Sequence, residues 1–124
     1  MKEWRMFVNM KFSAEQGMHK KAFGIDIVEL CSSNNPFPID GAVAYFRNNE
    51  YPCKINHGFY EMFYILDGEC SIVFEDKVVE LKKGDMHLIE PEKKHITQAK
   101  YADIFIVCNP PFDIKNVEFC EMNS

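Results

Sequence analysis

Residues 57–68 read HGFYEMFYILDG, a stretch that brings a histidine, a glutamate and a closing turn close together. Its apolar middle predicts a β-strand over residues 59–66 that ends at the turn Asp67-Gly68. On one extended strand His57 and Glu61 would lie about 13 Å apart, too far to share a ligand. They meet only if the chain reverses between them, and Gly58 is suited to that turn. We therefore expect His57 to end one strand and Glu61 to begin its antiparallel neighbour.

Short strands and turns also fill most of the remaining chain. From residue 42 onward, turn signals recur roughly every 8–10 residues, as expected of a sandwich or barrel. The predicted strands are residues 43–47, 53–57, 59–66, 70–75, 78–81, 86–90 and 104–108. Two earlier strands are expected at 4–12 and 25–30, and residues 13–24 are the one stretch suited to a short helix. Strands do not alternate with helices, which argues against a parallel α/β sheet and for one all-β domain.

Composition limits the chain's size class and partners. With 124 residues there is room for a single domain, and 47% hydrophobic residues supply a core. The net charge of -5 repels phosphate backbones and anionic lipid, so we expect neither nucleic acid nor membrane as a partner. The five cysteines are odd in number and form no CxxC motif, which favours reduced thiols in the cytoplasm. No signal peptide or membrane-length apolar run is visible, which also favours a cytoplasmic location.

Two segments resemble the motifs of the cupin superfamily. The first family motif has a His-x-His pair, three or four residues, a Glu, six residues and a Gly, and His57, Glu61 and Gly68 match its three-residue form. The second places a His after a Gly, five residues, Pro-x-Gly and two further residues, and Gly84 and His95 match it. The two motifs cover residues 49–99. The resemblance implies a jelly-roll barrel, or double-stranded β-helix, with its core at about residues 41–112 and an N-terminal strand extension at 1–40, all within one cupin domain of residues 1–124.

The match to the family motifs is incomplete. The first histidine of the pair is replaced by Ile55, and the leading glycine by Asn49. In the second motif Glu90, Glu92 and Ala99 stand at the Pro, Gly and Asn positions. These departures leave the fold assignment intact, because the turn residues and the strand pattern carry it. They remove the common four-ligand metal site.

Three candidate metal ligands remain: His57, Glu61 and His95. Two imidazoles and a carboxylate with open positions suit one divalent ion, whether Fe, Mn, Ni or Zn. A substrate or water would bind at the open positions. The competing interpretations are a buried His–Glu pair in a metal-free pocket, and an ordinary loop position for His95. Further side chains predicted to line the pocket are Ile55, Cys53, Tyr45, Phe63, Tyr64, His87 and Gln98.

The resemblance implies a metal-dependent enzyme of isomerase, dioxygenase or lyase type that acts on a small polar metabolite. The alternative is a non-catalytic cupin that binds or senses a small molecule through a degraded metal site, as the loss of a histidine at Ile55 suggests. A homodimer is also expected from the resemblance. The strand at residues 4–12 would otherwise leave an apolar edge exposed.

Overall fold

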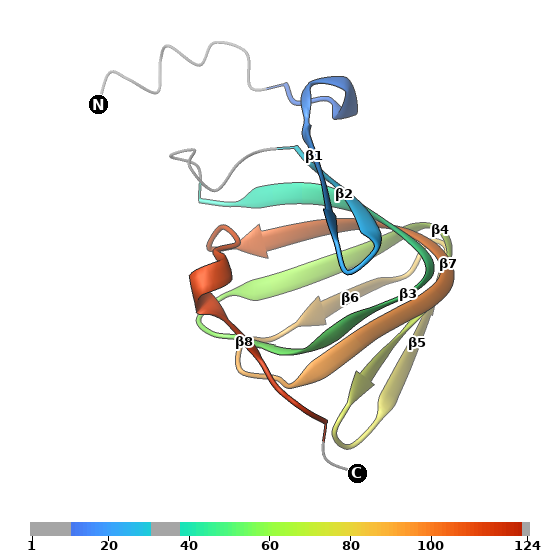
Figure 1. Ribbon diagram of the computed structural model, residues 1–124, viewed down its shortest axis with the longest axis vertical. Coiled ribbons are helices and arrows are strands. Elements are labelled where there is room, and N and C mark those ends of the chain that lie inside the picture. The colour runs from blue at the N-terminus through green and yellow to red at the C-terminus, as the bar shows by residue number, and fades with distance from the viewer. Residues whose placement is uncertain (1–10, 31–37, 123–124) are drawn as a thin grey trace.

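Three long, curved strands form the framework of the barrel (Figure 1). They are β3 (Asp40–Asn56), β4 (Tyr60–Phe74) and β7 (His95–Asn109). The structure is a computed structural model that describes residues 11–30 and 38–122. The shorter strands are β1 (Met18–Ala22), β2 (Ile25–Glu29), β5 (Val78–Lys82), β6 (Met86–Ile89) and β8 (Val117–Phe119). The two 3-10 helices are η2 (Ala14–Gln16) and η3 (Ile114–Asn116). Within these described ranges no helix is long and apolar enough to cross a membrane.

All strand pairs are antiparallel, in the order β1-β2-β3-β7-β4-β5, with β6 on β4 and β8 on β3. The central strand β7 pairs with β3 on one side and with β4 on the other, over almost its whole length. The register shifts once along β3–β7 and twice along β4–β7. Such bulges bend strands and increase their twist, which lets long strands curl around the interior. The predicted all-β jelly-roll barrel is confirmed.

The strands are longer than the sequence predicted. Residues 43–47 lie within β3, residues 53–57 lie within it except for His57, and residues 59–66 and 70–75 fall almost entirely within β4. His95 begins β7 rather than lying in a loop. The polar residues that resembled turns sit at or near the bulges, where the chain deviates without leaving the sheet. The helix expected at residues 13–24 is also wrong beyond the single turn of η2, because β1 and β2 form a hairpin there. Residues 4–10 of the first predicted strand lie outside the described residues.

The core lies between the inward faces of these strands. In the first part of β4 the buried side chains are Glu61, Phe63 and Ile65, while Tyr60 and Tyr64 alternate with them and face outward. The buried apolar cluster contains Ile25, Ala44, Phe46, Phe63, Ile65, Cys70, Ile72, Leu81, Ile89, Ala102 and Ile104. Four of its members, Ile25, Ala44, Phe46 and Phe63, also line an internal cavity, so the core supports the wall of that cavity directly.

Candidate functional site

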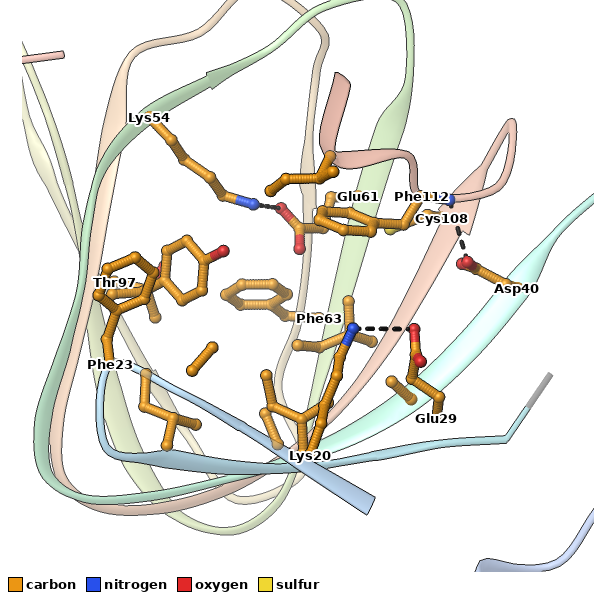
Figure 2. Close-up of a pocket in the computed structure, with 18 of the residues that line it drawn as sticks. Lys20, Phe23, Glu29, Asp40, Lys54, Glu61, Phe63, Thr97, Cys108 and Phe112 are labelled. Carbon is orange, nitrogen blue, oxygen red and sulfur yellow. Dashed lines mark hydrogen bonds and ion pairs between the residues drawn. The ribbon is translucent and has the colours of Figure 1, made fainter. Parts of the chain in front are cut away.

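A cavity of about 350 Å³ opens inside the barrel (Figure 2). Its walls are mainly aromatic and aliphatic, and its polar side chains fall into two groups. Lys54, Glu61 and Thr97 come from β3, β4 and β7, whereas Lys20, Glu29 and Asp40 come from the β1–β2 hairpin and the start of β3. A cavity of this size, mostly apolar with a few convergent polar groups, is typical of a small-molecule site.

The most deeply buried charges in the cavity wall are Lys54 and Glu61. The Lys54 Nζ atom lies 3.0 Å from Glu61 Oε1, and each side chain is only 7% exposed. Asn56 Nδ2 donates a second hydrogen bond, of 2.9 Å, to the same oxygen. Burial alone would raise the pKa of Glu61, but the Lys54 ammonium, His95 and these hydrogen bonds together hold that pKa below its ordinary value. Glu61 is therefore ionised at neutral pH, and its charge is compensated inside the barrel.

His95 lies beside this pair as a neutral imidazole. Its Nδ1 atom is 2.8 Å from the Lys93 carbonyl, which can only accept, so Nδ1 carries the proton. Burial lowers the pKa of His95, whose side chain is 1% exposed, and this keeps the ring uncharged. The lone pair of Nε2 then remains available, 3.9 Å from Glu61 Oε1. Nε2 and Asn56 Oδ1 are buried and have no hydrogen-bond partner among the described residues. Both residues contact or approach Glu61, but neither is part of the cavity lining.

His57 lies apart from these residues, on the outer surface. Its ring is 44% exposed and bridges two carboxylates, with Nδ1 2.5 Å from Glu92 Oε1 and Nε2 2.8 Å from Glu118 Oε1. Hydrogen bonds to Glu118 and Glu92 raise the pKa of His57. The structure brings Glu61 and His95 together but not His57, which corrects the predicted triad. The physical reason is strand parity: Asn56 is fully buried and faces inward, so its neighbour His57 faces outward.

The orientation of β3 identifies which form of the first cupin motif applies. With four residues before Glu61 instead of three, the two histidine positions fall on Lys54 and Asn56. Both are buried, and both donate hydrogen bonds to Glu61. The sequence reasoning missed these two residues. The signal that could have found them is the four-residue spacing itself, which places a cation and an amide at the positions of two imidazoles.

These residues do not fit a divalent metal. No group of three or more His, Cys, Asp or Glu side chains in the described part of the chain is arranged to hold one. Glu61 is already bonded to an ammonium group, and a metal bound to that carboxylate would lie within a few ångströms of Lys54. A divalent ion 4 Å from a unit positive charge is repelled by roughly 8 kcal/mol at an effective dielectric constant near 20. Glu61 and His95 alone leave too few ligands to offset that repulsion.

Of the seven further side chains predicted to line the pocket, Phe63 does line this cavity. The other six are not part of its lining, because the inward parity of β3 is the opposite of that assumed, and because several of them face outward on their strands. Cys53 is buried against Cys120, with 3.2 Å between the sulfur atoms, and His87 packs against Phe74. The remaining four are half-buried or exposed: Tyr45, Ile55, Tyr64 and Gln98.

Aromatic side chains from both ends of the described chain complete the wall. Phe23 of the β1–β2 turn contacts Tyr51 of β3 and Phe119 of β8, with ring centroids 5.0 and 5.8 Å apart. Phe112, which precedes η3, also lines the cavity. Local sequence patterns could not predict these contacts, since they join segments far apart along the chain.

Asp40 is a second buried carboxylate at the cavity. Its Oδ2 atom accepts a hydrogen bond of 3.0 Å from the Phe112 backbone N–H. Burial raises the pKa of Asp40 to about 6, with contributions from the nearby carboxylates of Glu29 and Glu61. A carboxyl group with a raised folded-state pKa stabilises the fold below its unfolded pKa near 3.8, and this contribution is lost as the pH rises through about 6.

We expect Asp40→Asn to raise the free energy of unfolding at pH 7.5 by about 2–3 kcal/mol, because the amide keeps an acceptor for Phe112 without a buried charge. The gain should disappear near pH 4. Urea denaturation at both pH values measures it, with the exposed Asp76→Asn as control. An equal gain at both pH values would show that charge burial is not its cause.

The antiparallel jelly-roll barrel and its polar-ended internal cavity define the structural class: a small β-barrel with an internal cavity. Residues 48–106 match the family model described as "Cupin domain". This match covers a little under half of the chain, and it agrees with the resemblance of the two motifs to those of the cupin superfamily. A search of curated proteins gives no match.

Solved structures share this fold at low sequence identity. A variant of Streptomyces PAC13 bound to uridine is 14% identical, with a TM-score of 0.78 over 94% of this chain and 93% of that one. Ectoine synthase from P. lautus is 15% identical, with a TM-score of 0.74 over 94% and 93%. KdgF from Halomonas sp. is 13% identical, with a TM-score of 0.73 over 86% and 98%. At these identities the similarity establishes the fold.

Proposed function

We propose that this protein is a cupin enzyme that moves protons on a small polar metabolite, with Glu61 as the acid–base group. The observation that carries the proposal is the buried Lys54–Glu61 pair in the wall of the cavity. Enzymes place an ionised carboxylate out of water when it is used for proton transfer. Of the reaction types that the family resemblance implies, isomerase and lyase chemistry need only such transfers.

The surroundings of Glu61 supply a route for the proton. Its carboxylate is held ionised by Lys54 and is therefore ready to accept a proton from a bound molecule. A ligand oxygen that accepts a hydrogen bond from the Lys54 ammonium would weaken the interaction between Lys54 and Glu61. The pKa of Glu61 would then rise, and its carboxylate would become a stronger base. The neutral His95 presents its Nε2 lone pair 3.9 Å from Glu61 Oε1, where it can accept the proton in turn.

The cavity favours a compact, ring-bearing ligand with polar groups at its edge. Aromatic rings from Phe23, Tyr51, Phe63 and Phe112 line it, and such rings pack on flat or sugar-like rings. A nucleoside fits this description, and one relative, Streptomyces PAC13, is described as bound to uridine. We propose a ligand of that size class.

The alternative is a non-catalytic cupin that binds or senses the same ligand. The replacement of both motif histidines by Lys54 and Asn56 favours it, because a site that has lost its metal ligands can retain binding without turnover. Elemental analysis of purified protein tests for the divalent ion predicted from the sequence. Stoichiometric metal would favour the metal-dependent enzyme over both of these functions.

A ligand screen followed by isotope exchange tests the proposal. Nucleosides, sugar derivatives and keto acids are first screened by thermal melting. A ligand at a hundredfold excess over its Kd adds about 2.7 kcal/mol, or roughly 8–16 °C in Tm. Ligands that bind are then incubated with the protein in D₂O, and we expect NMR to detect deuterium incorporation at a carbon position.

Glu61→Gln should slow this exchange by about 10²- to 10⁴-fold while the ligand still binds. Glu29→Gln is the matched control, since Glu29 also lines the cavity in an ion pair with a lysine, and it should retain exchange. Tight binding without exchange in the native protein would instead support the sensor.

Two other predictions from the sequence stay proposals. The four described cysteines are all free thiols, in keeping with the proposed cytoplasmic location. A homodimer would have an apolar surface to use, because β4 and β6 expose Tyr60, Tyr64, Leu66, Met86 and Leu88 on the outer face of the barrel.

A further inference from the structure

We propose that Lys54 is the permanent cation of this site: its ammonium group stands in for a divalent metal and binds an electron-rich oxygen of the ligand, such as a carboxylate or a carbonyl. Metal exclusion, the first part of this inference, is independent of the proposed enzyme activity. The ligand class, the second part, deepens the proposed function by naming what the site recognises.

Three of the four motif positions converge on one carboxylate oxygen of the fourth, Glu61. Lys54 Nζ lies 3.0 Å and Asn56 Nδ2 2.9 Å from Glu61 Oε1, and His95 Nε2 lies 3.9 Å from the same atom. In the family motif these four positions carry three histidines and a glutamate. Here the set has one positive group, the Lys54 ammonium, and it already neutralises the glutamate. The four side chains therefore meet as the ligands of a metal site would, but the positive charge comes from the Lys54 ammonium.

The ammonium group has capacity left for a ligand. It carries three N–H donors, and Glu61 is its one hydrogen-bond acceptor in the described part of the chain. The rings of Tyr51 and Phe112 flank it, with centroids 5.0 and 5.8 Å from Nζ, and these rings limit access by water. Figure 2 shows Lys54 reaching toward Glu61 across the cavity. A ligand oxygen that enters this cavity meets a buried donor with positive charge.

The other lysine of the cavity is a poorer candidate and a useful control. Lys20 forms an ion pair of 3.1 Å with Glu29, but its side chain is 42% exposed. Water can solvate this ammonium, and its position on β1 gives it no buried imidazole or amide neighbour among the interactions of the described residues. Lys20 and Lys54 thus offer the same chemistry in the same cavity with different burial.

The first test restores imidazoles at the two motif positions. Zn²⁺ alone is titrated by calorimetry into chelator-treated wild type, Lys54→His, Lys54→His/Asn56→His and Lys20→His. We expect no stoichiometric binding by wild type or Lys20→His. The double variant should bind about one ion per chain, with an affinity more than about 100-fold higher than that of wild type. Changes to groups that only support the metal ligands alter affinity by about 10- to 100-fold, so a larger gain indicates new ligands.

Circular dichroism establishes which variants are folded. If the double variant unfolds, Lys54→His alone still supplies a third ligand to Glu61 and His95 and should show the gain. Wild-type protein that binds Zn²⁺ stoichiometrically and loses it in His95→Ala would overturn the inference without any reference to the variants. A folded double variant with no gain over wild type would overturn the claim that the four positions converge.

The second test uses benzoate as a carboxylate probe and benzyl alcohol as its uncharged counterpart. Glu61→Gln leaves the Lys54 ammonium without its carboxylate partner, so benzoate should bind this variant more tightly than it binds wild type. Adding Lys54→Met to Glu61→Gln should abolish the preference for benzoate over benzyl alcohol, whereas adding Lys20→Met should retain it. Equal benzoate affinity in all three variants would contradict the ligand class. Neither test requires turnover, so both outcomes stand even if the proposed proton transfer fails.

Discussion

Replacing Lys54 with Met should lower the free energy of unfolding at neutral pH by about 3–5 kcal/mol, the usual effect of removing one partner of a buried ion pair. For a chain of 124 residues this corresponds to a fall in Tm of roughly 10–25 °C. The cost arises because Glu61 would keep its charge inside the barrel with only Asn56 as a donor. Urea denaturation at pH 7 measures the loss.

The pH dependence of this loss separates charge burial from simple loss of packing. In the native protein the pKa of Glu61 is lowered, so its contribution is present above the unfolded value of 4.5 and is lost as the pH falls through the folded pKa. In Lys54→Met, burial without the ammonium should raise that pKa above 4.5, so the destabilisation should begin to shrink as the pH falls through the raised pKa. It should shrink further below about 4.5, where the native protein loses its own contribution.

Lys54→Met combined with Glu61→Leu serves as the control, because replacing a whole buried ion pair by apolar residues is often neutral. This double variant should recover most of the lost stability. A pH-independent loss shared by the single and double variants would mean that the two charges are not coupled.

Gly68→Ala should destabilise the barrel by at least about 3 kcal/mol, because left-handed strain is added to an overlap with a neighbouring strand. Gly68, the closing glycine of the first motif, has a φ of +78°. A Cβ atom there would lie 2.2 Å from the Tyr101 carbonyl oxygen and 2.7 Å from Tyr101 Cδ1. The carbonyl belongs to β7, which pairs with β4 on both sides of this point, so it cannot withdraw without disturbing the ladder.

Gly58→Ala is the matched control for this effect. Gly58 has a nearly identical φ of +79°, but a Cβ atom there would meet nothing within 4 Å. We expect it to cost about 1–2 kcal/mol from backbone strain alone. Chemical denaturation of the two variants side by side measures the difference in their free energies of unfolding. Equal losses of stability would show that the contact with Tyr101 does not contribute to the effect.

The barrel and part of the site could be predicted from the sequence. Glu61 and His95 were identified from their spacing to Gly68 and Gly84 in the two motifs that resemble those of the cupin superfamily. Both glycines have positive φ, Gly84 in the turn between β5 and β6 and Gly68 near the bulges inside β4. Their proximity in the structure agrees with that reasoning. Turn chemistry is local and is visible in a single sequence.

The inward direction of β3 could not be predicted in the same way. Cys53, Ile55 and His57 share one face, and the apolar members made that face look like the interior. The structure shows that β8 pairs with this end of β3, and that Cys120, just after β8, packs against Cys53 on the outer face. Both faces of β3 are thus at least partly covered near residue 54, so alternation no longer indicates which one lines the cavity. The covering segment lies about 60 residues further along the chain, beyond the reach of local patterns.

For the ligand proposed above, the β1–β2 hairpin would control the rate of exchange separately from the affinity. Strand β1 pairs with β2 and with no other strand in the described part of the chain, and most of its side chains are exposed. Peeling β1 away would therefore break one short ladder and the Lys20–Glu29 and Lys21–Asp26 ion pairs, while the β3–β7–β4 framework stays intact. Segments of this kind open at a small fraction of the global unfolding free energy. Residence time would then depend on residues 18–29, and affinity on the cavity wall around Lys54, so the two properties can change independently.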